Sequence, residues 1–290
     1  MKKERFKVFQ RFLYIVPAAL LLVIFFIIPI LLTVYYSFTN LALSGENAKN
    51  VHFIGLANYI AMTKDSYMKV SILRTLIFLV GSLVGQTVLG FSIALLMKGK
   101  NTSFRGIVGP VFLSAWVIPE VVVALCCVAY FGSEGTLNVI LNVFHIQPIE
   151  WIYSIPMVTI ILANVWHGTA FSMLNFQSAL DGVPGDIEEA ALVDGANGLQ
   201  KLFYVIIPCI KNTIATNTML NTLSTLGVFG LVYIMTGGGP GTKTLTLPIL
   251  MYRKAFISQQ LGYGTAIAMV LLSIGLMMSI LYTRVVKEDI

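Results

Sequence analysis

The chain has 290 residues, of which 57% are hydrophobic and only 11% are charged. A soluble domain of this length does not need so much apolar side-chain surface, so the composition indicates a membrane protein. The formal net charge of +6 is spread over the edges of apolar runs, which is typical of charge that sets membrane topology and excludes a nucleic-acid patch.

The apolar runs predict an all-α integral membrane protein with six transmembrane helices in one domain, residues 1–290. The expected spans are about 12–36, 70–97, 106–131, 152–179, 213–235 and 263–286. The first run is too long for a signal-peptide core and lacks a small-residue cleavage site, so we expect it to be retained as a span.

Six spans place both termini on the same side of the membrane. Most of the lysines and arginines fall on that side: Lys2, Lys3, Arg5, Lys7, Arg11, Lys98, Lys100, Arg105, Lys201, Lys211, Arg284 and Lys287. Because positive residues are enriched in cytoplasmic loops, we expect both termini and the loop 181–208 in the cytoplasm.

The loop 181–208 is a polar, acid-rich segment in an otherwise apolar chain. Pro184 suits the start of a short helix, and Gly195 suits its end in the left-handed conformation. Asn197 is placed to cap a second helix that runs to Pro208. Ala190 and Ala191 in the first helix would give it a flat, closely approachable side.

Several motifs of this chain resemble those of one family. The segments are Glu189-Ala190-Ala191, Asp194-Gly195-Ala196 and Ile207-Pro208 in the polar loop, FIGLANY at 53–59, and Thr236 with Gly238-Gly239-Pro240. The first three look like the EAA loop of the membrane subunits of binding-protein-dependent ABC importers, and the others look like segments of the carbohydrate-type permeases. The loop departs from the family pattern at Glu188, where an aromatic residue is frequent, and at Val193.

The resemblance implies a type I ABC importer permease fold in the cell (inner or plasma) membrane of a prokaryote. It implies a second homologous permease subunit, two cytoplasmic ATPase subunits, an extracytoplasmic solute-binding protein and a sugar or oligosaccharide substrate. ATP and Mg would be bound by the ATPases, so we expect no cofactor on this chain. The coupling residues carried over are Glu189, Ala190, Ala191, Asp194, Gly195 and Ala196.

No catalytic constellation is visible in the sequence. His52, His145 and His167 are scattered, and Cys126, Cys127 and Cys209 lack metal-ligand spacing, so we predict neither an enzyme nor a metal site. GGGPGTKT at 237–244 is not a P-loop, because its lysine does not directly follow the glycine.

Polar or small residues recur at helical spacing in three predicted spans, and such residues are the default functional candidates inside a membrane. They are Trp116 and Glu120, then Asn164, Gly168 and Phe171, then Asn221, Thr225 and Val228. Aromatic rings beside amides and a carboxylate suit a sugar, so we predict that these stripes line its pathway. The stripes also fall where the maltose-type permeases line theirs.

Alternative interpretations remain at this point. Asn and Thr in a span are also common in helix–helix contacts, and the aromatic residues could be packing. Glu120 could equally bind substrate, pair with a partner subunit or stay protonated. His167 reads as an ordinary helix histidine. At the level of function, the alternative is a secondary, ion-coupled transporter, which would require internal repeats and embedded ion ligands.

Overall fold

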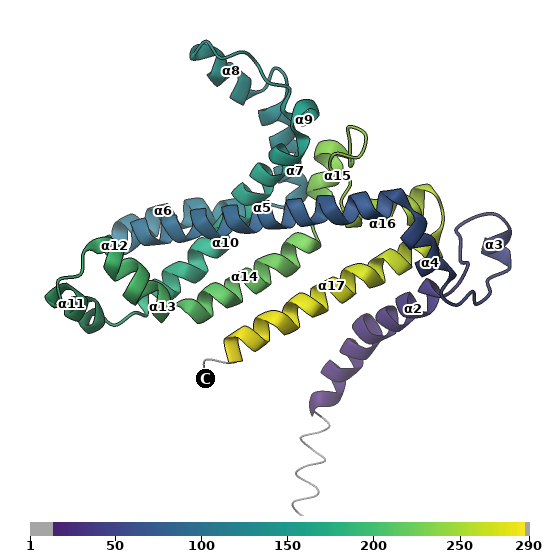
Figure 1. Ribbon diagram of the computed structural model, residues 1–290, viewed down its shortest axis with the longest axis horizontal. Coiled ribbons are helices and arrows are strands. Elements are labelled where there is room, and N and C mark those ends of the chain that lie inside the picture. The colour runs from purple at the N-terminus through teal and green to yellow at the C-terminus, as the bar shows by residue number, and fades with distance from the viewer. Residues whose placement is uncertain (1–13, 288–290) are drawn as a thin grey trace, which may run out of the picture. The chain divides into compact units, whose positions relative to one another are not determined.

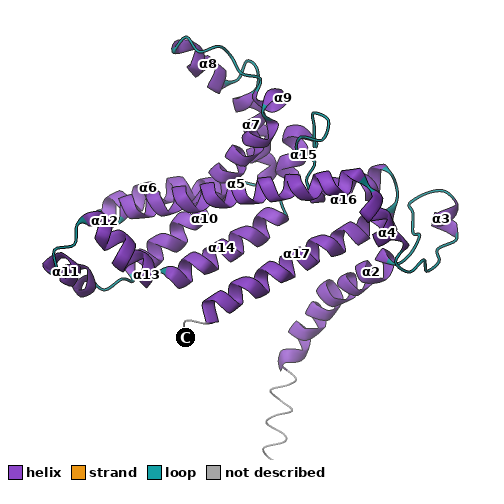
Figure 2. Ribbon diagram, in the orientation of Figure 1, coloured by secondary structure: helices purple, strands orange, loops and turns teal. Residues whose placement is uncertain are grey.

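A computed structural model of the chain describes residues 14–287, and over these residues the structure is helical. Figure 2 shows helices and loops, and the described part of the chain contains a single β-bridge, between Thr39 and Phe53, and no strand. The predicted all-α class is therefore confirmed. The basic residues predicted at positions 2–11 lie outside the described residues, so the cytoplasmic location of the termini stays a prediction.

The described part of the chain forms two compact units, residues 14–65 with 251–270 and residues 66–250 with 271–287. The helices of the first unit are Tyr14–Ser37, which includes η1 (Val23–Ile27) and α2 (Ile28–Ser37), then α3 (Glu46–Lys49), α4 (Ala57–Lys64), η3 (Arg253–Ile257) and the start of α17 (Leu261–Lys287). The π-helical turn η1 ends two residues before Pro29, whose missing N–H interrupts the regular ladder.

The FIGLANY segment of the first unit caps the first span. Asn58 Nδ2 donates to the carbonyl oxygens of Ser37 and Thr39, at 2.9 and 3.0 Å. Tyr59 adds a hydrogen bond from its hydroxyl to Ser37 Oγ, at 2.9 Å. The carbonyls at a helix C-terminus have no partner within the helix, so these bonds explain why an amide and a phenol follow the span at this distance.

The second unit contains the remaining helices (Figure 1). They are α5 (Ser66–Met97), α6 (Thr102–Val117), α7 (Glu120–Phe131), α8 (Thr136–Val143), α9 (Trp151–Ser154), α10 (Pro156–Asp181), α11 (Gly185–Val193), α12 (Gly198–Lys201), η2 (Leu202–Ile206), α13 (Ile207–Cys209), α14 (Lys211–Leu226), α15 (Gly230–Thr236), the start of α16 (Leu247–Tyr252) and the end of α17. Among residues 14–287, five helical stretches are long and apolar enough to cross a membrane, or six if α14 and α15 count as one bent span.

Two of the predicted spans are broken rather than continuous. The predicted span 106–131 ends as α6 at Val117 and resumes as α7 at Glu120, because Pro119 lacks the N–H that a continuous helix needs. The membrane-length stretch in this region is Glu120–Val143. The predicted span 213–235 is divided into α14 and α15, which differ in direction by 49° across the residues that follow Leu226.

Helices α5 and α10 pack side by side and in parallel (Figure 1). Their contact is close because glycines of α5 face α10. A Cβ added to Gly90 would lie 2.5 Å from the Ser172 Cβ and 2.9 Å from the Met173 backbone nitrogen. Within a membrane, where helices gain little from the hydrophobic effect, such small residues permit the van der Waals contact that holds helices together.

The C-terminal ends of α5 and α10 share a buried apolar cluster with the segment that follows α12. Its members are Ala94, Met97, Met173, Phe176, Leu180, Ile206 and Ile210. The cluster joins three parts of the chain that are distant in sequence, so it fixes the base from which α11 projects.

The glycine contact generates a stability prediction. We expect Gly90→Ala to destabilise the folded chain by about 1–3 kcal/mol, because the new methyl group meets a backbone that cannot yield. Gly106→Ala, in α6, is the matched control: nothing lies within 4 Å of its added Cβ, and alanine favours a helix. Thermal unfolding in detergent measures both; an unchanged midpoint for Gly90→Ala would contradict the close packing of α5 on α10.

Candidate functional site

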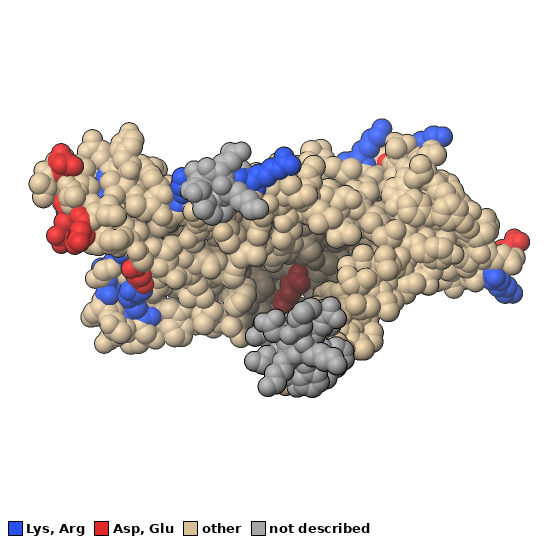
Figure 3. Space-filling model, turned by 90° about the horizontal axis from the view of Figure 1, so that it is seen from below, with Lys and Arg blue, Asp and Glu red and all other residues tan. Residues whose placement is uncertain are grey.

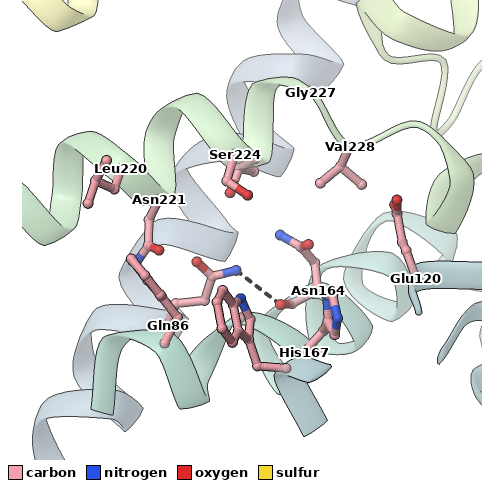
Figure 4. A pocket seen from close by; sticks show the side chains of 13 residues that line it. Gln86, Glu120, Asn164, His167, Leu220, Asn221, Ser224, Gly227 and Val228 are labelled. Carbon is pink, nitrogen blue, oxygen red and sulfur yellow. Dashed lines mark hydrogen bonds between the residues drawn. The ribbon is translucent and has the colours of Figure 1, made fainter. Parts of the chain in front are cut away.

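A cavity of about 350 Å³ lies in the second unit, between helices of four predicted spans (Figure 4). It is lined by Gln86, Trp116, Glu120, Asn164, His167, Gly168, Phe171, Leu220, Asn221, Ser224, Thr225, Gly227 and Val228. All eight residues of the predicted stripes are among them. The structure therefore brings the three stripes together around one space.

Trp116 and Glu120 reach the cavity in a way that helical spacing did not predict. They belong to different helices, α6 and α7, and the break before Glu120 separates them. The Trp116 ring lies 5.5 Å from the Phe171 ring of α10, centroid to centroid, at an interplanar angle of 32°. The two rings thus form a joint apolar surface on the cavity wall.

Glu120 is held by the backbone of the broken fifth span. Its Oε1 accepts a hydrogen bond of 2.9 Å from the Leu231 N–H in the first turn of α15. The first N–H groups of a helix have no partner within it, and inside a membrane no bulk water replaces that partner. Gly230 leaves room for the carboxylate, since an added Cβ would lie 3.4 Å from Oε2.

His167 has the corresponding role at the broken third span. Its Nε2 lies 3.3 Å from the carbonyl oxygen of Ile118, the residue directly before Pro119. A carbonyl only accepts, so Nε2 donates in this contact. The prediction of an ordinary helix histidine omitted its place on the cavity wall.

Gln86 and Asn164 form the polar centre of the cavity. Gln86 Nε2 donates to the Asn164 backbone oxygen at 3.0 Å, and Gly168 makes space for it, because an added Cβ would lie 2.3 Å from Nε2. The Asn164 side chain is only 4% exposed, and its Nδ2 has no hydrogen-bond partner. The sequence analysis missed Gln86, although a lone amide in an apolar span was a usable signal.

Asn221 both lines the cavity and joins two helices. Its Nδ2 donates to Ser172 Oγ of α10 at 2.7 Å. One turn earlier, Asn217 Nδ2 contacts the same hydroxyl at 3.2 Å and Asn217 Oδ1 accepts from Asn175 at 3.0 Å. The alternative interpretation of these residues as interhelical contacts is therefore also met by the structure.

The polar loop folds as its capping residues predicted. Helix α11 follows Pro184 and ends before Gly195, which has a φ of +81°. The Asn197 side chain accepts from the Gln200 N–H, and the Gln200 side chain accepts from the Asn197 N–H, which forms a capping box. Of the predicted coupling residues on α11, Ala191 is buried, whereas Glu189 and Ala190 are exposed.

Glu188 ties α11 to two neighbouring segments. Its carboxylate pairs with Lys98, directly after α5, and with Lys201 of α12 at 3.1 Å. Figure 3 shows charged side chains gathered at the end of the chain's second unit where α11 and α12 lie. Burial by itself raises the pKa of Glu188, but the hydrogen bonds and charges of Lys98 and Lys201 outweigh it, so the pKa lies below its ordinary value of 4.5.

The sequence analysis treated Glu188 only as a departure from a pattern, because its two partners become neighbours through the fold. Elsewhere among residues 14–287, no group of three or more His, Cys, Asp or Glu side chains is arranged to hold a metal ion.

Comparisons with known proteins agree over most of the chain. Residues 86–288 match the family model described as "Binding-protein-dependent transport system inner membrane component". The sulfoquinovosyl glycerol transport system permease protein SmoG of Agrobacterium fabrum is 32% identical, with 95% of this chain and 89% of the relative covered. The trehalose/maltose transport system permease protein MalF of Thermococcus litoralis is 28% identical, with 94% and 92% covered.

A solved structure has the same fold. A chain of the bacterial alginate ABC transporter in complex with alginate pentasaccharide-bound periplasmic protein superimposes with a TM-score of 0.82 at 19% identity. The match covers 99% of this chain and 98% of that one.

The Glu188 pairing predicts a pH dependence for α11. Because the pKa of Glu188 is lowered in the folded state, its stabilising effect is present above pH 4.5 and is lost as the pH falls through the lowered value. A nitroxide on Val193→Cys should therefore become more mobile in acid, as measured by EPR. Glu188→Gln should show the mobile spectrum at all pH values, whereas Asp186→Asn, on the same helix, should behave like the parent; a pH-independent spectrum in the parent would refute the assignment.

Proposed function

Since the chain belongs to the family of binding-protein-dependent transport system inner membrane components, and is thus a multi-pass permease subunit of an ABC importer, we propose that its cavity is half of a saccharide pathway. The names of its relatives support a carbohydrate. They include the permease for sulfoquinovosyl glycerol and that for trehalose and maltose. Membership of this family makes the chain a transport component and not an enzyme by itself.

The observation that carries the proposal is the unpartnered amide of Asn164 in the cavity wall. A buried N–H group without a partner costs free energy, and a sugar hydroxyl in the cavity would supply the missing acceptor. The Trp116 and Phe171 rings offer an apolar surface to the C–H face of a sugar ring. Amides and ring faces together suit a ligand that has hydroxyls at its edge and C–H groups on its faces.

The proposed assembly completes the pathway with other chains. A second, homologous permease subunit would supply the other half, and a solute-binding protein would deliver the sugar from outside. Two ATPase subunits, which would hold ATP and Mg, would dock at α11 through its exposed residues Glu189, Ala190 and Asp194. Gly195 and Ala196 would shape the end of that docking helix.

We expect motion of the ATPases to reach the cavity through α11. Glu188 links this helix to the end of α5 through Lys98, and the buried apolar cluster links α5 to α10. Both helices also carry cavity residues, namely Gln86 on α5 and Asn164 on α10. A displacement at α11 would therefore move the side of the cavity that α5 and α10 form together.

The proposed pathway predicts different effects for two asparagine substitutions. Asn164→Ala should weaken transport by the equivalent of one hydrogen bond, about 1–3 kcal/mol, while the thermal midpoint of the chain stays unchanged because its Nδ2 has no partner to lose. Asn217→Ala is the matched control. It should lower the midpoint, because its amide contacts both Ser172 and Asn175. Sugar uptake in proteoliposomes and unfolding in detergent separate the two effects; normal uptake by Asn164→Ala would exclude the proposed contact.

The proposed role of α11 predicts that a substitution at its end uncouples ATP hydrolysis from transport. Gly195→Val should reduce sugar uptake several-fold while ATPase activity and membrane insertion persist, because a β-branched residue is strained at a φ of +81°. Gly198→Val, at the start of α12, is the control, since Gly198 does not have a positive φ and has open space around it. Coupled uptake at the parent rate in Gly195→Val would count against a role of this helix end.

A further inference from the structure

The charge of the cavity wall is one-sided. Among the thirteen described residues that line the cavity, Glu120 is acidic, His167 is the one residue that can become a cation, and none is Lys or Arg. The names and titles of the relatives do not decide the charge of the substrate, because they include both trehalose or maltose and the acidic polysaccharide alginate. The charge of the accepted substrate therefore depends on the charged groups in the cavity wall.

The carboxylate of Glu120 is fixed in the wall. Its hydrogen bond to the Leu231 N–H is 2.9 Å long and ties Oε1 to the backbone of α15, so a rotation that makes room for another anion would break this bond. Charges separated by a few ångströms within a protein interact more strongly than they do in bulk water. An anionic ligand in this space would be repelled.

His167 does not compensate for this repulsion. Its Nε2 faces the Ile118 carbonyl at 3.3 Å, so the donor at this nitrogen is already engaged. The geometry thus offers an anion no fixed positive partner in the wall.

From these contacts we infer that the cavity takes uncharged saccharides and rejects anionic ones, with Glu120 as the discriminating residue; this inference rests on the proposed pathway function. Oε1 already accepts from the Leu231 N–H. The wall also offers neutral polar groups, namely the amides of Gln86, Asn164 and Asn221 and the hydroxyls of Ser224 and Thr225. The Trp116 and Phe171 rings complete a surface suited to neutral sugar rings.

The test uses matched sugars on the assembled transporter in nanodiscs. The probes are maltotriose and cellotriose, each compared with the same trisaccharide in which one CH₂OH group is oxidised to a carboxylate. Binding is read as protection of Ser224→Cys from a membrane-impermeant maleimide, in a background without Cys126, Cys127 and Cys209. Ser224 is exposed to the cavity, so its cysteine should react in the absence of sugar.

We expect equal protection to require an at least about tenfold higher concentration of the oxidised sugar than of its neutral partner. This ratio corresponds to about 1.4 kcal/mol of binding free energy. Glu120→Gln should reduce this ratio several-fold, since glutamine removes the charge and retains an acceptor for the Leu231 N–H. Asn164→Ala, the control, should weaken both members alike and leave the ratio unchanged.

The outcomes separate the inference from the proposed function. Equal protection by both members of a pair, or a ratio that Glu120→Gln does not alter, overturns charge selection but leaves the pathway intact. Stronger protection by an amino-sugar analogue than by the neutral sugar overturns the uncharged class. Protection by no saccharide at all, with Ser224→Cys still reactive, counts against the proposed function and with it the inference.

Discussion

Backbone groups inside a membrane must find partners within the protein, and the centre of this structure is arranged around two places where a helix does not supply them. The third predicted span breaks at Pro119 and the fifth breaks after Leu226. His167 donates to the carbonyl exposed at the first break, and Glu120 accepts from the N–H exposed at the second. The two residues that make the breaks tolerable therefore also line the cavity that the breaks open.

The remaining architecture connects this cavity to the charged loop. Helix α10 places Asn164 in the cavity wall and Leu180, four turns further along, in the buried apolar cluster near α11. Helix α5 does the same with Gln86 and Met97. The glycines of α5 hold the two helices so close that they are expected to move as one body, which suits transmission along them.

Local signals in the sequence were sufficient for much of this structure. Pro184, Gly195 and Asn197 placed the helices of the polar loop because capping depends on a few neighbouring residues. The stripe on α10, and Asn221 with Thr225 on α14, followed from helical periodicity. Val228 also lines the cavity, but it lies after the end of α14, where the helical spacing does not apply. The helix break at Pro119 was not predicted, since whether a span tolerates proline depends on neighbouring helices.

Long-range contacts account for the residues that the sequence analysis missed. Gln86 has its role through a glycine on another helix, and Glu188 through two lysines brought together by the fold. No local pattern contains such information. The membrane-sidedness of the termini depends in part on residues 2–11, which lie outside the described chain, and remains a prediction.

Amino-acid substitutions at positions 120 and 231 affect the hydrogen bond between Glu120 and Leu231 to different degrees. Its donor is a main-chain N–H, which survives every replacement of Leu231 except proline. Its acceptor is a side chain, so the bond depends on the residue at position 120 and on the room that Gly230 leaves for it. A point mutation in a glutamate codon gives glutamine, which keeps the bond and removes the charge. A lineage of such permeases could thus change the charge that its pathway accepts without redesigning the broken helices around it.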